Sequence, residues 1–415
     1  MELKEYKLGD LIEVTRGMSL PGEFYSTEGE YIRLTCGNFD YVNNSFKENK
    51  SKDDLYYVGK IKPEFIMEKG DIITPLTEQA IGLLGSTAII PESGKYIQSQ
   101  DVAKVTCKKG MIDHDFAYYL IPSKCIKEQL SAAAQQTKIR HTSPDAIKAC
   151  KVFVPPLSEQ KKIASVLSAL DDKIALNKKM NQKLEAMAKR LYDYWFVQYD
   201  FPDKNGHPYK TTGGSMTYNE TLKREIPVGW EVKTLADLAE YVKTTTKFDK
   251  AFNYVSTDNM LPQKQGLSGE NLKPASGNVL CYEKDDILIS NIRPYFKKIW
   301  YADQSGTCST DVLCIRSQNS DNSCFVYKTL WQDDFFDYVM QGAKGSKMPR
   351  GDKTRIMNYP ICIAKENFDE LIKKFSALTI PMQAIIQKNT KEISRLTKLR
   401  DKLLPLLMNG QVVVG

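Results

Sequence analysis

The chain has 415 residues, 42% hydrophobic and 26% charged, so it can bury two or three cores and lacks the composition of a disordered protein. Its N-terminus, MELKEYKLGDLIEV, has no signal-peptide run, and no stretch of about 18 apolar residues follows that would span a membrane. Nine cysteines without a Cys-x-x-Cys pair and only three histidines argue against a zinc site or a disulfide framework, so we expect a reduced, cytoplasmic protein.

The formal net charge of +7 is concentrated in two segments that look helical. Residues 157–198 hold eight basic and five acidic side chains, and residues 369–415 hold eight and four. The remaining chain is therefore nearly neutral, and a nucleic-acid binder of this kind would use local basic loops rather than a uniform field.

Residues 1–155 predict a small α+β lobe built from short strands. The run EKGDIITP at 68–75 is an acidic turn followed by an apolar strand, and SQDVAKV at 99–105 predicts a second strand. The lobe ends in a polar loop, AAAQQTKIRHTSPD, before a last short strand and two prolines. We refer to this segment as lobe 1.

Residues 156–198 predict one long helix, because nothing after Pro156 breaks it and apolar residues recur at heptad spacing. Ser158 with Glu159 and Gln160 favours a helix start there. We expect Trp195 to be core, with Tyr192, Tyr194 and Phe196 close to it. The predicted seam of the helix consists of Ile163, Leu167, Leu170, Ile174, Asn177, Asn181, Leu184, Ala188, Leu191 and Trp195.

A connector rich in Pro, Gly, Ser and Asn is predicted over 199–229, and a second lobe, lobe 2, over 230–367. Lobe 2 repeats lobe 1: both open with a Leu-x-Asp-Leu pattern, EKDDILIS at 283–290 matches EKGDIITP, and STDVLCI at 309–315 matches SQDVAKV. The order of the strands within a lobe does not follow from these patterns.

Residues 368–415 repeat the long helix. A shift of 212 carries the first seam onto Phe375, Thr379, Met382, Ile386, Asn389, Ile393, Leu396, Arg400, Leu403 and Leu407. We predict an antiparallel pair of helices with Asn177 and Asn389 close to the crossing point, where buried Asn would fix the register. Pro381 is expected to kink the second helix or delay its start.

The run VPPLSEQKKIASVLSALDDKIALNKKMNQKLEAMAKRLYDYWF, the connector from FPDKNGHPYKTTGGSM to LKREIPVGWE and the tail LTKLRDKLLPLLMNG resemble the specificity subunits of type I restriction–modification systems. This resemblance covers nearly the whole chain. It implies two target-recognition domains that alternate with two helical regions and are related by a pseudo-twofold, each domain reading one half of a split double-stranded DNA target.

The resemblance also implies partners and cofactors. The helix pair would set the spacer and dock two copies of a modification subunit that methylates adenine with S-adenosylmethionine. Restriction subunits would add translocation and cleavage with ATP and Mg²⁺, so no cofactor or metal would belong to this chain. About one turn of DNA, 34–36 Å, is within reach of a helix of this length. A longer helix should therefore widen the gap in the target.

The residues themselves carry no catalytic signature. The chain has no Walker A motif, no Asn-Pro-Pro-aromatic or Asp-Pro-Pro-aromatic tetrapeptide, and no Gly-rich cofactor loop after a strand. We therefore expect a chain that is not an enzyme by itself. Two other functions remain open on the residues alone: a coiled-coil interaction scaffold with two ligand-binding lobes and no DNA role, and a nuclease or methyltransferase with unrecognised motifs.

Candidate DNA-contacting residues lie in the polar loops that close the lobes and in SNIRPYFKKIW, because Gln and Arg can bond base edges and Lys grips phosphate. The matching run in lobe 1, TPLTEQAIGLLG, has no cation, so we expect the two lobes to read differently. The candidates are Gln135, Gln136, Thr137, Lys138, Arg140 and His141 in lobe 1, and Arg293, Tyr295, Lys297, Lys298, Lys344, Lys347, Arg350, Lys353 and Arg355 in lobe 2.

Overall fold

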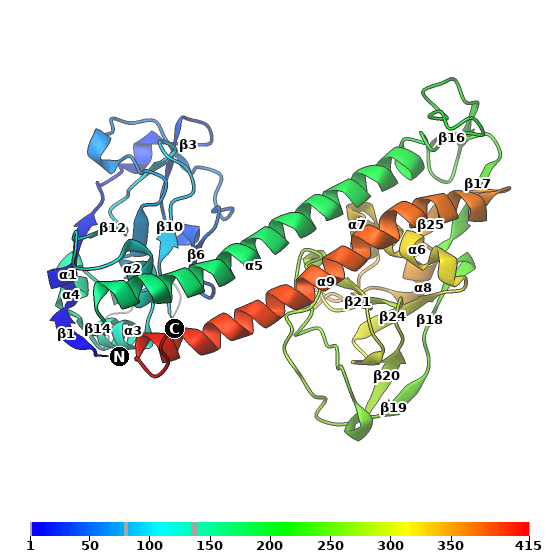
Figure 1. The fold of residues 1–415 in the computed structure, drawn as a ribbon. Helices are drawn as coiled ribbons and strands as arrows, with labels where there is room; N and C mark the ends of the chain where they lie inside the picture. The colour runs from blue at the N-terminus through cyan, green and yellow to red at the C-terminus, as the bar shows by residue number, and fades with distance from the viewer. Residues whose placement is uncertain (1, 79–81, 134–139, 415) are drawn as a thin grey trace. The chain divides into compact units, whose positions relative to one another are not determined.

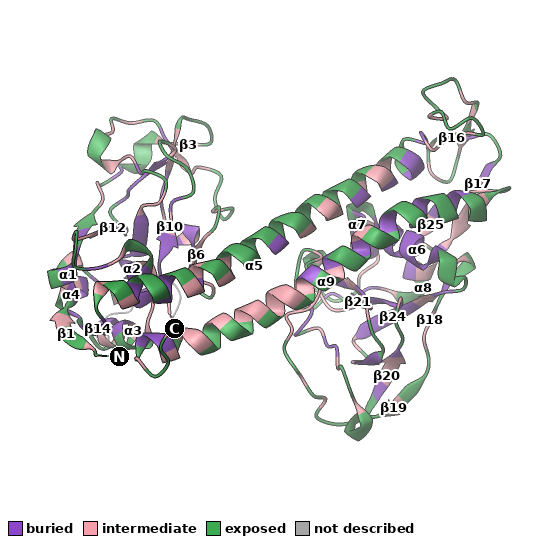
Figure 2. Ribbon diagram, viewed as in Figure 1, coloured by how far each residue is buried: buried purple, intermediate pink, exposed green. Residues whose placement is uncertain are grey.

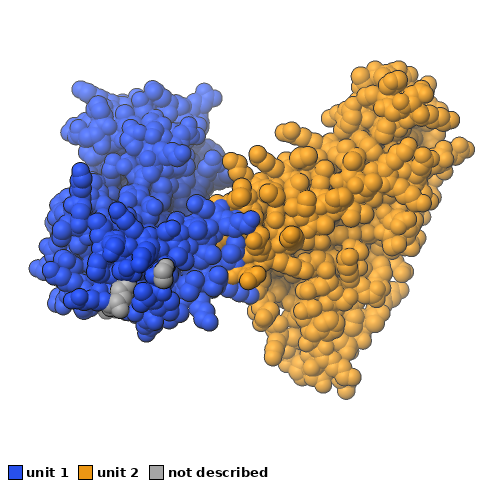
Figure 3. Space-filling view, in the orientation of Figure 1, with its two compact units in different colours: residues 1–173, 396–415 blue, residues 174–395 orange. Residues whose placement is uncertain are grey.

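The computed structural model describes residues 2–78, 82–133 and 140–414. The chain forms two compact units, coloured separately in Figure 3. The first unit holds residues 1–173 and 396–415, and the second holds residues 174–395. Each unit therefore contains one lobe together with a part of each long helix. Figure 1 labels the elements within both units.

The main sheet of lobe 1 has four strands in the order β10-β8-β12-β2, and all neighbours are antiparallel. Apolar side chains of these strands are buried. Side chains alternate between the two faces of a strand, and strands this short bury enough apolar surface only by sharing a core. A separate pair, β1 with β14, joins the first and last strands of the lobe. The bounds are β1 Lys4–Lys7, β2 Ile12–Arg16, β8 Ile72–Pro75, β10 Ala88–Ile89, β12 Val102–Cys107 and β14 Lys151–Val154.

Smaller elements complete lobe 1. A second sheet has the order β11-β4-β7-β3, and two strand pairs, β5 with β6 and β9 with β13, lie outside the sheets. The strands are β3 Tyr25–Ser26, β4 Tyr31–Arg33, β5 Phe39–Asp40, β6 Ser45–Phe46, β7 Tyr56–Tyr57, β9 Thr77–Glu78, β11 Tyr96–Ile97 and β13 Arg140–His141. The helices are α1 Leu8–Leu11, α2 His114–Leu120, α3 Lys124–Ala133 and α4 Pro144–Ala149.

Lobe 2 repeats the topology of lobe 1. Its main sheet has the order β18-β24-β21-β22, which matches β2-β12-β8-β10, and β17 pairs with β25 as β1 pairs with β14. The predicted repeat of the lobes is thus confirmed at the level of strand order. The bounds are β17 Trp230–Thr234, β18 Ala239–Tyr241, β21 Ile287–Ser290, β22 Ile299–Tyr301, β24 Val312–Ser317 and β25 Pro360–Ala364.

The rest of the second unit surrounds this sheet. A three-stranded sheet, β19-β20-β23, comprises Thr245–Lys247, Asn278–Tyr282 and Gly306–Cys308. The predicted connector contains a hairpin, β15 Met216–Asn219 with β16 Arg224–Pro227, and the ring of Phe201 stacks on Tyr209 at 4.8 Å. The helices of the lobe are α6 Ser323–Leu330, α7 Asp333–Gln341 and α8 Lys353–Met357.

Two long helices alternate with the lobes. Helix α5 spans Leu157–Tyr192 and ends in a π-helical turn at Asp193–Val197, and α9 spans Phe368–Met408. The expected delay at Pro381 is wrong, since α9 begins well before it. Pro381 is exposed, and so is Ala377, whose carbonyl loses its partner at Pro381, so water can satisfy that carbonyl.

The helices pair in antiparallel register within each unit. In the second unit, the Trp195 and Phe375 rings lie 5.8 Å apart, and Asn389 Nδ2 donates to Asn181 Oδ1 at 2.9 Å. In the first unit, Asp171 on α5 contacts Arg400 on α9 at 2.8 Å. As numbers rise along α5 they fall along α9, as the seam predicts. Figure 2 shows the resulting alternation of buried and exposed residues along both helices.

The polar seam positions differ from the prediction in one respect. Asn177 and Asn389 are both buried, but they do not pair with each other: Asn177 Nδ2 donates to Glu392 Oε2 at 2.9 Å, while Asn389 bonds Asn181. In the observed register, Asn177 faces Glu392, which lies about one helical turn from Asn389. Each therefore bonds a polar group of the facing helix other than its repeat partner. The 212-residue shift matches Asn177 to Asn389, but it matches Glu392 to Met180 rather than to Asn181, so the two contacts are similar and not identical.

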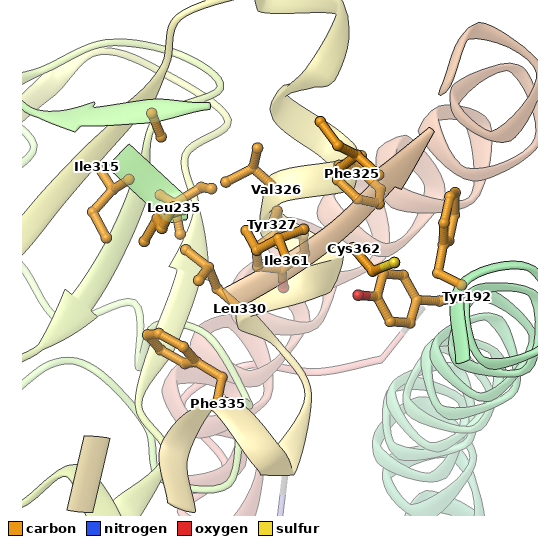
Figure 4. Packing of buried hydrophobic residues seen from close by; sticks show 14 of the residues in the cluster. Tyr192, Leu235, Ile315, Phe325, Val326, Tyr327, Leu330, Phe335, Ile361 and Cys362 are labelled. Carbon is orange, nitrogen blue, oxygen red and sulfur yellow. The ribbon is translucent and has the colours of Figure 1, made fainter. Parts of the chain in front are cut away.

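The largest core lies in the second unit, where α5 and α9 pack on lobe 2. Trp195 is buried in it as predicted, together with Tyr192 and Phe196, whereas Tyr194 is exposed. Figure 4 shows Tyr192 of α5 beside Phe325 of α6 and Cys362 of β25. In the first unit, Ile163 and Leu167 of α5 share the lobe 1 core with Leu407 and Met408 of α9.

Candidate nucleic-acid interface

The same backbone junction occurs in both lobes where the chain leaves the second strand of the main sheet. In lobe 1, Leu76 N–H donates to the Asp101 carbonyl at 2.8 Å, and Thr142 N–H donates to the Leu76 carbonyl at 2.8 Å. In lobe 2, Asn291 N–H donates to the Asp311 carbonyl at 2.9 Å, and Gly351 N–H donates to the Asn291 carbonyl at 3.3 Å. We call this junction and its side chains the strand-end site.

These hydrogen bonds fix which residues of the two lobes are equivalent. Leu76 corresponds to Asn291, Asp101 to Asp311 and Thr142 to Gly351. The next residues, Ser143 and Asp352, agree with this alignment, because each caps the helix that follows it. Counting two residues onward from Leu76 and Asn291 aligns Glu78 with Arg293. Counting one residue back from Thr142 and Gly351 aligns His141 with Arg350.

In lobe 1 the strand-end site holds an arginine against a buried carboxylate. Arg140 Nη1 lies 3.3 Å from Glu78 Oε2 and 3.2 Å from Ser131 Oγ. The Glu78 side chain is only 6% exposed and also accepts the Gly82 N–H, whereas Arg140 is 32% exposed. Because the carboxylate and the hydroxyl fix the guanidinium, Arg140 presents a preset donor group rather than a mobile one.

His141 is the exposed end of a short polar chain beside this pair. Thr77 Oγ1 donates to Asp101 Oδ1 at 3.1 Å, and the same hydroxyl oxygen lies 3.5 Å from His141 Nδ1. The predicted residues Arg140 and His141 are thus brought together on β13. The other predicted residues of this loop, Gln135, Gln136, Thr137 and Lys138, lie outside the described residues.

In lobe 2 the strand-end site carries two arginines and one carboxylate. Arg350 forms a β-bridge to Ile292, and its Nη1 lies 3.0 Å from Asp311 Oδ1, with the side chain 55% exposed. Arg293 occupies the place of Glu78 and adopts a left-handed backbone, with φ of 50°. Its Nε and the Oδ1 of Asn291 are buried without a hydrogen-bond partner among the described residues.

Two of the predicted lysines in this region are engaged within the protein. Lys297 Nζ lies 2.6 Å from Asp333 Oδ1, and Lys264 Nζ lies 2.8 Å from the same oxygen. Hydrogen bonds from these two ammonium groups lower the pKa of Asp333 to about 2. Lys298 donates to the Thr257 carbonyl at 2.6 Å, and burial lowers its pKa. Tyr295 is exposed on the same turn.

The polar loop that closes lobe 2 divides into exposed and packed residues. Lys347 and Lys353 are exposed, and Lys344 is exposed while pairing with Asp352 at 3.2 Å. Arg355 instead packs on α7: its Nε donates to the Tyr338 carbonyl at 3.2 Å, and its guanidinium lies 4.2 Å from the Tyr338 ring. These contacts are typical of a structural role for Arg355, and its DNA contact stays a prediction.

Sequence reasoning missed the residues that organise the strand-end site. Glu78, Asp101 and Asp311 position the arginines and the threonine, and Asn291 supplies an unpaired acceptor. A signal for two of them existed, because Asp101 and Asp311 are the shared acid of the repeated SQDVAKV and STDVLCI motifs. Glu78 had no such signal, since its charge changes sign between the lobes.

The long helices leave apolar side chains exposed, several of them seven residues apart. Figure 2 shows exposed residues along both helices. The large apolar ones among them are Leu176, Met180 and Met187 on α5, Tyr194 in the π-helical turn that follows it, and Leu378, Ile380, Ile385 and Leu399 on α9. In the second unit, a groove of about 570 Å³ lies between Met187, Tyr194 and Leu378. A helix pair that kept every apolar residue for its own seam would not show this second row.

The comparisons with known proteins agree with the repeat. A family model described as "Type I restriction modification DNA specificity domain" matches residues 1–186. The type I restriction enzyme MjaIX specificity subunit of Methanocaldococcus jannaschii is 25% identical over 100% of this chain and 89% of its own length. The family model therefore matches lobe 1 and most of α5, and the relative that spans the whole chain is a type I specificity subunit.

A further relative and a solved structure cover the chain almost end to end. The type I restriction enzyme HindI specificity subunit of Haemophilus influenzae is 23% identical over 99% of both chains. A crystal structure of the type I S subunit from M. genitalium superposes with a TM-score of 0.60, at 18% identity, over 98% of this chain and 96% of that one. This second likeness establishes the fold. Within the described residues, no helix is long and apolar enough to cross a membrane.

Proposed function

We propose that each lobe reads one half of a bipartite double-stranded DNA target through its strand-end site and the polar loop beside it. The observation that carries this proposal is the repeat of one backbone junction with different side chains. Equivalent hydrogen bonds hold Leu76 and Asn291, whereas Glu78 and Arg293 have opposite charge at matched positions. Two lobes that recognise different base sequences need the same backbone arrangement with different polar side chains.

The helix pair supplies the second half of the function. Its buried seam holds the two helices together, and the apolar side chains that α5 and α9 leave exposed offer a surface for partners. Two copies of a modification subunit dock on the helices, and restriction subunits join that core. The 212-residue shift matches the exposed Met187 to the exposed Leu399, so each helix carries one such side chain at an equivalent position.

The chemistry belongs to the partners in this proposal. S-adenosylmethionine is bound by the modification subunits, which methylate adenine, and ATP and Mg²⁺ are bound by the restriction subunits. The chain acts in the cytoplasm, where host and invading DNA meet these enzymes. The scaffold without a DNA role, which the residues alone left open, is not favoured, because the relatives are type I specificity subunits.

The test is a comparison of methylomes. Long-read sequencing maps methylated bases in cells that carry this gene and its partner methyltransferase, in cells that lack only this gene, and in cells with the gene restored. We expect a split adenine-methylation motif that disappears with the gene and returns with it. An unchanged methylome, with the partner shown to be expressed and active, would remove the proposal.

A further inference from the structure

Arg293 is one of three basic residues of lobe 2 with left-handed backbone, and the other two, Lys264 and Lys297, are paired with Asp333. This conformation costs a non-glycine residue about 1–3 kcal/mol and persists only where surrounding structure enforces it. The enforcing contacts are the hydrogen bond from Arg293 N–H to the Pro349 carbonyl, at 2.8 Å, and the adjacent bridge between Ile292 and Arg350. What sets Arg293 apart is therefore its side chain, which has no such pairing.

The side chain of Arg293 also has no use within the lobe. Its Nε is buried without a hydrogen-bond partner among the described residues, a costly state for a charged donor group. The nearby carboxylate of Asp311 is already paired with Arg350 at 3.0 Å, and that of Asp333 with Lys297 and Lys264. In this site, Arg350 is paired with a carboxylate, whereas Arg293 has a donor group without a partner among the described residues.

We infer that Arg293 reads a guanine in the half-target bound by lobe 2, with Arg350, held by Asp311, beside it. This inference rests on the proposed function. Guanine presents two acceptors, O6 and N7, in the major groove, and the planar fork of arginine matches both at once. Asn291 Oδ1, two residues away, is a buried acceptor without a partner among the described residues, and a bridging water or a donor on the same base pair would satisfy it on entering the site.

Among the residues of lobe 1 that the structure describes, none takes the part of Arg293. At the position of Arg293, lobe 1 has Glu78. Its carboxylate pairs with Arg140 and accepts a hydrogen bond from the Gly82 N–H. The position equivalent to Arg140 in lobe 2 is Pro349, which has no side-chain donor at all. The requirement for guanine through this position is therefore confined to one half of the target, and the two halves differ at the corresponding base.

The experiment uses the complex of this chain with its modification subunit and the mapped target. The half-target beside lobe 2 is identified by photocrosslinking from residue 347, which is exposed on the polar loop. Each guanine there is replaced by 7-deazaguanine, which lacks only the N7 acceptor, and dissociation constants are measured at fixed salt. Arg293→Lys and Arg293→Gln are compared with Lys347→Gln as the matched control, after each variant is shown to assemble and to unfold at the wild-type temperature.

We expect one 7-deazaguanine to weaken binding of the wild-type complex by roughly 5- to 100-fold, as for a lost bidentate base contact. Arg293→Lys should bind the native target with a similar loss and be insensitive to the same 7-deazaguanine, because an ammonium keeps the charge and loses the fork. Lys347→Gln should retain the sensitivity.

Three results would overturn the reading of guanine. The first is a lobe 2 half-target without guanine on either strand. The second is an Arg293→Lys complex that binds like wild type. The third is a uniform weakening of binding to all sequences by the Arg293 variants, as a phosphate contact would give. Failure of the proposed function looks different, because the wild-type complex would then bind target and non-target DNA with the same affinity.

Discussion

Asp171 is the polar centre of the first unit, and its removal gives the sharpest test of how lobe 1 is held on the helices. Its carboxylate, on α5, accepts a hydrogen bond from Tyr119 Oη of α2 at 2.7 Å and lies 2.8 Å from Arg400 Nη1 of α9. Three elements therefore meet at one side chain. The Arg400 side chain is 12% exposed and Asp171 is 29% exposed, so water screens the cluster only in part.

The cost of Asp171→Ala follows from what the change leaves behind. Hydrogen bonds to a charged group each contribute about 1.5–3 kcal/mol, and a buried donor left without a partner costs about 1–3 kcal/mol. Tyr119 loses its acceptor completely, whereas Arg400 keeps Asp401 at 2.7 Å. Because the two losses share one carboxylate they do not add fully, and we expect about 2–4 kcal/mol of destabilisation of the first unit.

Hydrogen exchange measured by mass spectrometry resolves this effect by unit. Amides of α2 should exchange roughly 30- to 700-fold faster in Asp171→Ala, the equivalent of about 2–4 kcal/mol when exchange follows local opening. Tyr119→Phe should show a smaller change, because it removes the donor and leaves the Asp171–Arg400 pair intact. Peptides of α6 in the second unit are the internal control and should not change.

Unchanged exchange in α2 would refute this account of the lobe 1 contact. Equal acceleration in both units would refute it in another way, since the cluster would then support the whole chain rather than lobe 1.

Three further predictions concern the second unit and the helices. Phe375→Ala removes a fully buried ring that contacts Tyr192, Trp195 and Phe196, and should lower the free energy of unfolding of the second unit by about 3–5 kcal/mol in calorimetry, whereas the exposed Leu378→Ala should not. Burial lowers the pKa of Lys328, which bonds Gln383 at 3.1 Å near the partly buried Glu185. Between the lowered pKa of Lys328 in the folded chain and its ordinary pKa of about 10, the unfolded chain binds more protons, so stability rises with pH across that window. Lys328→Met should flatten this slope in urea titrations at several pH values. Inserting seven residues at matched seam positions of α5 and α9 adds about 10 Å, and the gap in the methylation motif should grow by about three base pairs; an unchanged gap would contradict the helices as the spacer.

The fold followed from the sequence where the pattern was long and periodic. The heptad seam predicted both helices and their antiparallel pairing, because a spacing of three and four residues can be satisfied only by one helical face. The Leu-x-Asp-Leu and strand motifs predicted the repeat of the lobes. Strand order did not follow, since two-residue strands such as β9 and β13 are held by tertiary hydrogen bonds and leave no local signal.

The candidate site was predictable only in outline. The polar loops supplied Arg140, His141 and Arg350, which do lie at the strand-end sites. Which cations are engaged within the protein could not be predicted, because Lys297 and Arg355 meet their partners Asp333 and Tyr338 through folding rather than through sequence spacing. The partner of Asn177 was not predicted for the same reason. The observed register differs from the expected one by one helical turn, so Asn177 bonds Glu392 instead of Asn389.

The strand-end site is built from peptide groups, and this has a consequence for how such a protein can change over generations. The bonds at Leu76, Thr142, Asn291 and Gly351 use only N–H and C=O groups, which every residue except proline possesses. Leu76 is buried and a Cβ at Gly351 would lie 2.9 Å from Asn291 Oδ1, so these two positions are constrained. Exposed neighbours such as His141 and Arg350 can change while the peptide hydrogen bonds stay, so a new target preference can arise without a new fold. A lineage under attack by altered invaders can thus explore recognition by point substitution in one lobe while the other lobe and both helices stay unchanged.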